Sequence, residues 1–110
     1  MAEIRFSERG TAEEIVPDVK VTRSKTGNSG TATFYFEDPK ILGQGNTDEI
    51  QGLFLVDEEG SIVSREVKGK FVNGKARGIE AVLIMKSAEE FERFVRFMEK
   101  YASENGLDKN

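Results

Sequence analysis

The chain has 110 residues, of which 37% are hydrophobic and 33% are charged, a composition typical of one globular domain and not of a disordered or fibrous protein. The absence of cysteine excludes disulfides, thiolate metal sites and a cysteine nucleophile, and the absence of histidine removes the commonest metal ligand and general base. A net charge of −4 argues against general affinity for nucleic acid or anionic lipid, so we expect any membrane association to run through another protein, with no direct membrane insertion.

The apolar runs of the chain are short. The longest, residues 53–56 and 81–85, fall far short of the ~20 residues that a membrane-spanning helix needs. The first six residues have neither the basic start and apolar stretch of a signal peptide nor the serine-rich, acid-poor composition of a transit peptide. We therefore expect a chain that does not cross a bilayer and that remains where it is made.

Short segments rich in Val, Ile, Phe and Thr, bounded by Gly and Asp, fill most of the chain up to Lys86 and predict antiparallel strands. In the segment of residues 31–37, Ala32, Phe34 and Phe36 share one side, as the alternation of a strand requires. The predicted strands are residues 3–6, 17–23, 31–37, 50–56, a segment from residue 62 onwards, 68–72 and 76–85, with a short strand at 40–42 inside an exposed connection from 38 to 46.

Two loops resemble ligand sites, but plain turns are the favoured interpretation. Residues 25–30 (KTGNSG) are rich in glycine, yet they lack the lysine-threonine ending of a nucleotide-binding loop. The adjacent acids of residues 57–59 lack the alternating oxygen ligands and the closing glutamate of a calcium-binding EF-hand, so we expect a solvated turn.

The clearest short-range signal is Asn73-Gly74, which accepts positive φ at both central positions of a type I′ turn. It predicts a hairpin between residues 68–72 and 76–85. Apolar residues alternate on both faces of the returning strand, which is therefore expected to be central in its sheet and covered on both sides. One face carries Ile79, Ala81, Leu83 and Met85, and the other carries Val82 and Ile84.

One long helix is predicted after the strands. Ser87 with Glu90 has the spacing of a capping box, and Asn105-Gly106 is a typical helix end. Two i,i+4 pairs are expected on the solvent face, Glu89 with Arg93 and Glu92 with Arg96. The stripe expected to pack on the sheet consists of Phe91, Phe94, Val95, Met98, Tyr101 and Ala102.

Together these elements predict an α+β fold in which antiparallel β-sheet packs against one long C-terminal helix, as a single domain spanning residues 1–110. No catalytic pattern accompanies it. The twenty carboxylates leave a paired-acid glycosidase open by residue type alone, but they lie in predicted turns and on the solvent face of the helix, and no serine lies in a G-x-S-x-G elbow. We expect a protein that is not an enzyme and that has no cofactor and no metal site.

The charges are distributed unevenly. Residues 65–77 carry five cations and one acid, although the chain as a whole is acidic. One interpretation is that lysines protect a sheet edge from aggregation, and the other is that a basic edge pairs with an extended segment of a partner protein. The predicted partner-binding residues are Arg65, Lys68, Lys70, Lys75, Arg77, Arg23 and Lys25.

Several long blocks of the sequence resemble one known family. They are residues 17–24 (PDVKVTRS), 29–36 (SGTATFYF), 56–60 (VDEEG), 67–74 (VKGKFVNG), 91–101 (FERFVRFMEKY) and 104–107 (ENGL). In this order and over nearly the whole chain, the blocks are similar to the Psb28 family of photosystem II accessory proteins.

The resemblance implies a cofactor-free assembly or repair factor for photosystem II. Such a factor binds transiently to the cytoplasmic face of unfinished complexes, on the inner antenna protein beside the cytochrome b subunits and on reaction-centre subunits. It implies a peripheral protein of the thylakoid membrane, monomeric, which extends its sheet with a segment of the partner. The absent transit peptide favours a cyanobacterial or plastid-encoded member.

Two rival hypotheses belong to other classes. One is an RNA-binding sheet in which Phe34, Phe36 and Phe71 stack on bases beside the basic hairpin. The other is an enzyme for a small ligand, which a deep pocket lined by convergent polar groups would favour.

Overall fold

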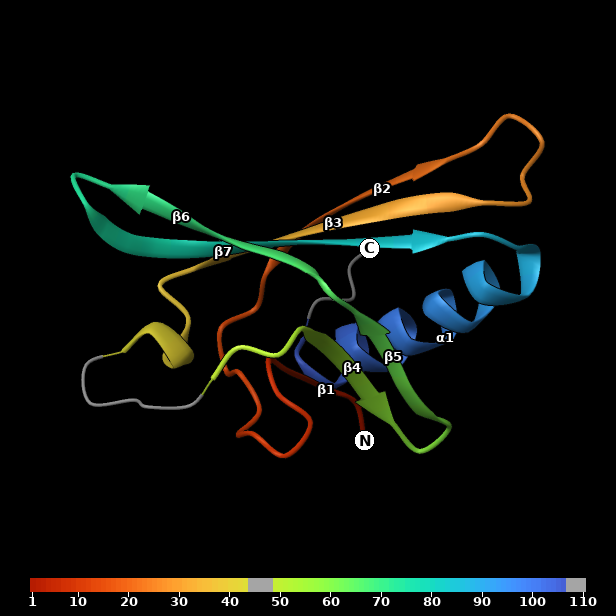
Figure 1. Ribbon diagram of the computed structural model, residues 1–110. Coiled ribbons are helices and arrows are strands. Elements are labelled where there is room, and N and C mark those ends of the chain that lie inside the picture. The colour runs from red at the N-terminus through yellow and green to blue at the C-terminus, as the bar shows by residue number, and fades with distance from the viewer. Residues whose placement is uncertain (44–48, 107–110) are drawn as a thin grey trace.

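The computed structural model describes residues 1–43 and 49–106, which form two antiparallel sheets and one C-terminal helix (Figure 1). The larger sheet has the order β2-β3-β7-β6, with β2 at Asp18–Arg23, β3 at Gly30–Glu37, β7 at Lys75–Met85 and β6 at Glu66–Val72. The smaller sheet has the order β1-β4-β5, with β1 at Glu3–Arg5, β4 at Leu53–Asp57 and β5 at Gly60–Ser64. The helix α1 spans Ala88–Glu104. This architecture confirms the predicted α+β class.

The helix and the smaller sheet lie on the same side of the larger sheet, and α1 contacts both β4 and β7 (Figure 1). The core fills the space between these three layers. In the larger sheet, Phe34 of β3 lies opposite Ala81 of β7, so a large side chain pairs with a small one across the strands. The Phe34 ring also meets the Phe94 ring of α1 edge to face, with centroids 6.2 Å apart.

The predicted β6–β7 hairpin is confirmed. Asn73 and Gly74 have φ of 53° and 80°, as a type I′ turn requires. Strand β7 is also central, between β3 and β6. The expectation that β7 is covered on both faces is wrong, since Ile84 is 51% exposed. Because α1 and the smaller sheet both lie on one face of the larger sheet, no helix or strand of residues 1–43 and 49–106 covers its other face.

The helix begins as predicted, because the Ser87 side chain accepts a hydrogen bond from the Glu90 amide. The Glu90 carboxylate accepts from the amide of Lys86, one residue before the cap. The expected apolar stripe is partly wrong. Phe97 is fully buried, whereas Val95 keeps some solvent contact. The buried face is rotated toward Phe97 because α1 packs in the angle between two sheets and not on one.

The short strand expected at residues 40–42 is wrong, because Lys40–Leu42 form a turn of 3₁₀ helix. The buried carboxylate of Glu13 accepts hydrogen bonds from the amides of Lys40 and Ile41, at 2.6 and 2.9 Å. A side chain from a distant segment thus satisfies amides that a strand would have paired. The predicted connection continues to residue 46, and its last part lies outside the described residues.

Candidate partner-binding surface

Strand β6 is an outer strand of the larger sheet and pairs only with β7. Val67 packs against the hydrophobic core, and every residue from 68 to 72 is exposed. Within residues 1–43 and 49–106, no other segment makes a backbone hydrogen bond along the free edge of residues 68–72. The backbone of β6 is therefore accessible to an extended segment of another protein.

Two of the predicted binding residues, Lys68 and Lys70, lie side by side on the outer face of β6. Lys68 lies opposite Glu80 of β7 in the strand register, and Lys70 forms an ion pair with Glu80 at 2.8 Å. The hydrogen bond from Lys70 lowers the pKa of Glu80 below its usual value. One acid is thus shared by two cations, which leaves a net positive charge beside the free edge.

Lys75 and Arg77 lie farther along the same hairpin. A β-bulge falls between the Lys70–Gly78 and Phe71–Ala76 pairs, so Arg77 is an extra residue on β7 without a direct partner on β6. The carbonyl oxygen of Arg77 accepts a hydrogen bond from the amide of Asp38 at 2.8 Å. The structure therefore brings Lys68, Lys70, Lys75 and Arg77 onto one hairpin.

Arg65 is the single residue between β5 and β6, where the chain passes from the smaller sheet to the larger one. Its guanidinium donates to the carbonyl oxygen of Gln51 at 2.7 Å and lies 5.4 Å from the centre of the Phe54 ring. These contacts fix the short connection between β5 and β6. Arg65 is exposed like the lysines of β6, but its guanidinium is therefore held against the body of the protein.

Arg23 and Lys25 lie at the opposite end of the larger sheet, at the β2–β3 hairpin (Figure 1). Arg23 lies over the Phe91 ring, 4.4 Å from its centre, and donates to the carbonyl oxygen of Gly27. The structure does not bring these two cations together with those of the β6–β7 hairpin. A partner that contacts both groups has to span the length of the sheet.

A buried ion cluster, which the sequence did not predict, joins the β4–β5 turn to α1. The side chain of Asp57 is fully buried and accepts hydrogen bonds from Arg93 at 3.0 and 2.6 Å and from Lys100 at 3.1 Å. Desolvation opposes ionisation of Asp57, but the hydrogen bonds from Arg93 and Lys100 outweigh it and lower the pKa to about 2. The expectation of a solvated turn is therefore wrong for Asp57.

The neighbouring acid Glu59 takes part in the same cluster. Hydrogen bonds from Arg96 and then Lys100 lower the pKa of Glu59 to about 2. The ion pairs that Arg93 and Arg96 form within the described residues go to the β4–β5 turn and not to the expected helix partners. The sequence signal that could have predicted this cluster is the spacing of three cations, Arg93, Arg96 and Lys100, along one side of the helix.

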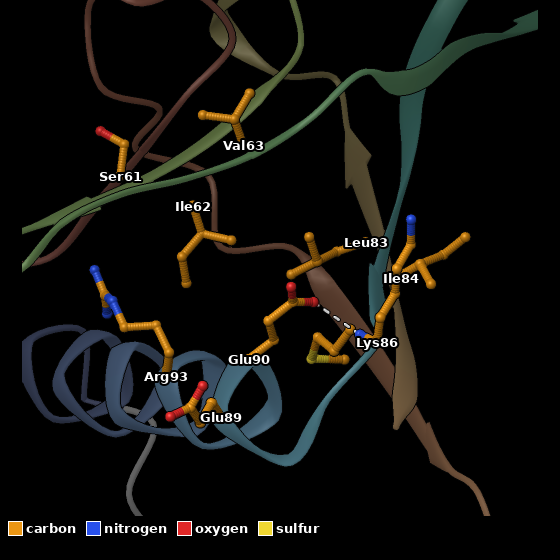
Figure 2. A pocket seen from close by; sticks show the side chains of 10 residues that line it. Ser61, Ile62, Val63, Leu83, Ile84, Lys86, Glu89, Glu90 and Arg93 are labelled. Atoms are coloured by element: carbon orange, nitrogen blue, oxygen red, sulfur yellow. Dashed lines mark hydrogen bonds between the residues drawn. The ribbon is translucent and has the colours of Figure 1, made fainter. Parts of the chain in front are cut away.

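An open groove of about 490 Å³ lies between β5, the end of β7 and the first turns of α1 (Figure 2). Its walls include Ile62, Leu83 and Met85, and its ionisable groups include Glu90 and Arg93. Glu90 is engaged with the amide of Lys86, which Figure 2 shows as a dashed line, and Arg93 is engaged with Asp57. These two polar groups serve structural contacts and do not converge on a common point in the groove.

The aromatic residues proposed for base stacking are not together on a surface. Phe34 and Phe36 are fully buried, and Phe71 alone of the three is exposed. Stacking of bases requires accessible ring faces. The predicted RNA-binding platform is therefore wrong for two of its three rings.

In residues 1–43 and 49–106, no group of three or more Asp or Glu side chains is arranged to hold a metal ion. No helix in the same part of the chain is long and apolar enough to span a membrane.

Comparisons with known proteins identify the family. The sequence profile described as Psb28 protein matches residues 4–109 of the chain. A protein from Trichormus variabilis named photosystem II reaction center Psb28 protein is 64% identical over 107 residues, which are 97% of this chain and 96% of the relative. Proteins of the same name from Nostoc sp. and Synechocystis sp. are 63% and 55% identical, over 97% of this chain and 96% and 95% of the relatives. The chain therefore belongs to the Psb28 family of photosystem II proteins.

Proposed function

We propose that the chain is a non-catalytic assembly or repair factor that binds transiently to photosystem II intermediates. Membership of a family whose members are named photosystem II reaction center proteins supports this role. Its partners are the inner antenna protein, beside the cytochrome b subunits, and the reaction-centre subunits. It acts as a monomer and as a peripheral protein on the cytoplasmic side of the thylakoid membrane.

The mechanism of binding is pairing of the free β6 edge with an extended segment of a photosystem subunit. The observation that carries this proposal is the accessible edge at residues 68–72, with cations beside it. Backbone hydrogen bonds between β6 and the added strand supply affinity. Lys68 and Lys70 attract an acidic segment and set its register, since electrostatic complementarity acts on specificity and association rate.

The alternation of side chains along β6 defines the chemistry of the partner segment. Lys68 and Lys70 lie on the outer face, whereas Val67 and Phe71 lie on the other face. An added strand places every second side chain on each of these faces. The best match is a segment with acidic residues next to the two lysines and apolar residues next to Val67.

Co-purification tests the function. A tagged inner antenna protein should recover the chain from assembly intermediates under mild detergent. The K68Q/K70Q variant should reduce this recovery, whereas Lys20→Gln on β2, the other outer strand of the larger sheet, should not. Recovery of the chain only as free protein would contradict the assembly role.

Hydrogen exchange tests the mechanism separately. On binding, the amides of β6 should gain protection, while those of the other outer strand, β2, should not. Protection of β2 in place of β6 would refute pairing at β6 and leave the assembly role standing.

A further inference from the structure

The β6–β7 hairpin extends beyond the rest of the larger sheet. The β3–β7 ladder ends at the pair Glu37–Gly78, and the Arg77 carbonyl still accepts a hydrogen bond from the Asp38 amide. Among the described residues, positions 75 and 76 of β7 pair with β6 alone. All ten residues from 68 to 77 are exposed. In Figure 1 the hairpin projects away from α1. We call residues 68–77 the distal ribbon.

The tip of the distal ribbon carries unusual apolar exposure. Phe71 is 68% exposed and Val72 is 53% exposed. The chain has eight phenylalanines and two tyrosines, all within the described residues, and Phe71 is the only one of them that is exposed. The Phe71 ring lies over Gly69, where an added Cβ would be 3.3 Å from a ring carbon.

The charge of the distal ribbon is of one sign. It contains four cations, Lys68, Lys70, Lys75 and Arg77, and no acid, although the whole chain has a net charge of −4. Lys70 and Lys68 are partly compensated by Glu80, whereas no acid forms an ion pair with Lys75 or Arg77 in the described residues. A surface that contacts this tip therefore meets positive charge, although the chain as a whole is negatively charged.

From these observations we propose that the tip of the distal ribbon binds the headgroup region of an anionic lipid bilayer, with Phe71 and Val72 inserted between the lipids and Lys75 and Arg77 on the phosphates. An exposed aromatic side chain beside cations suits an interface that is apolar on one side and polyanionic on the other. A convex tip fits a deformable bilayer better than a protein surface, which would need a matching pocket. Proteins that bind single-stranded nucleic acid stack successive bases on several aromatic rings, so a single exposed ring is a poor binding surface for it.

This inference goes beyond the proposed function and departs from the expectation that membrane association runs only through protein. That expectation rested on net charge, whereas the fold concentrates cations at one end. A contact made by one aromatic ring and two cations is weak by itself. It would orient the protein on the membrane and raise its local concentration there, while the protein partner supplies specificity.

Tryptophan fluorescence tests the proposal on the purified chain. The chain has no tryptophan, so Phe71→Trp introduces a single probe, and Asn28→Trp places a matched probe in the exposed turn at the opposite end of the sheet. With vesicles of equal parts phosphatidylglycerol and phosphatidylcholine at low salt, the F71W emission should shift to the blue and be quenched by brominated acyl chains. Vesicles of phosphatidylcholine alone should leave the F71W emission unchanged, and the N28W emission should not change with either vesicle.

Charge removal in the F71W background gives a second arm. The variant K75Q/R77Q should weaken binding to the anionic vesicles by about 25-fold, since each cation near such a surface contributes roughly a factor of five. The variant K20Q/K86Q removes the same charge from the body of the protein and should leave the affinity unchanged. Circular dichroism checks that all variants remain folded.

Three outcomes would overturn the proposal. They are an unshifted F71W emission with anionic vesicles, an equal shift of the N28W emission, and equal weakening by the two double variants. A change in F71W emission with an RNA oligonucleotide but not with vesicles would assign the tip to nucleic acid. Because the vesicles contain no protein, none of these results depends on binding to photosystem II.

Discussion

The Arg93 guanidinium holds the buried Asp57 carboxylate at two points, with N–O distances of 3.0 and 2.6 Å. Asp57 is the last residue of β4, and Arg93 lies on the second turn of α1. The pair therefore ties the smaller sheet to the helix. Lys100 reaches the same carboxylate at 3.1 Å, so one acid fixes two points along α1.

Removal of this carboxylate should destabilise the fold. We expect Asp57→Asn to lower the free energy of unfolding by about 2 kcal/mol, below the ~3–5 kcal/mol typical of broken buried pairs because Arg93 and Lys100 keep some solvent contact. Urea denaturation measures this loss. Glu58→Gln alters the next acid, whose side chain is 63% exposed, and should leave the midpoint almost unchanged. Equal effects of the two substitutions would show that the buried cluster has no special role.

Acid should weaken the same connection. The pKa values of Asp57 and Glu59 are lowered to about 2, from ordinary values of 3.8 and 4.5. The unfolded chain therefore binds more protons than the folded chain, so the stability that these groups contribute is present above about pH 4.5 and is lost as pH falls toward 2. The melting temperature should fall less steeply over this range in D57N/E59Q than in the unmodified chain. Parallel curves for the two proteins would contradict the assignment.

Two alanine substitutions on α1 should show which face of the helix is buried. Phe97 is fully buried, so Phe97→Ala should lower the free energy of unfolding by about 3–5 kcal/mol. Val95 is only partly buried, and Val95→Ala should cost about 1 kcal/mol or less. Urea denaturation compares the two. The reverse order would support the stripe predicted from the sequence.

The type I′ turn should stabilise the distal ribbon locally and contribute little to the stability of the core. Gly74 has a φ of 80°, where a side chain costs about 1–2 kcal/mol, so Gly74→Ala should disfavour the turn. Because residues 68–77 are exposed, we expect amide protection to fall at the tip while the global melting temperature changes little. Asn73→Gly keeps positive φ accessible and serves as the control. Loss of cooperative unfolding in G74A would show that the hairpin supports the core.

The Lys70–Glu80 pair should make charge reversal on β6 more disruptive than charge removal. Lys70→Glu places a second acid beside Glu80, and the melting temperature should fall slightly, because like charges on adjacent strands repel. The exchange K70E/E80K should restore the melting temperature. An unchanged value in K70E would mean that the pair is not formed in solution. Tests of partner binding are for this reason best made with glutamine variants.

Local sequence patterns predicted much of the fold. The alternation in β3, the Asn73-Gly74 turn and the Ser87 cap each depend on residues that are close in the chain, and the structure confirms all three. The strand expected at residues 40–42 was wrong because Glu13, far away in the sequence, caps their amides. The pattern of the segment itself contains no information about that partner.

For the candidate partner-binding surface, too, some features follow from the local sequence and others only from the tertiary structure. The sequence by itself determined that the residues from 65 to 77 are basic and form a hairpin, because charge and turn type are properties of adjacent residues. Only the tertiary structure decided that β6 is an outer strand, that Arg23 and Lys25 lie at the other end of the sheet, and that Asp57 is buried under Arg93. The physical reason is that strand order, edge exposure and burial arise from contacts between segments distant in the chain, whose energies depend on how the layers pack.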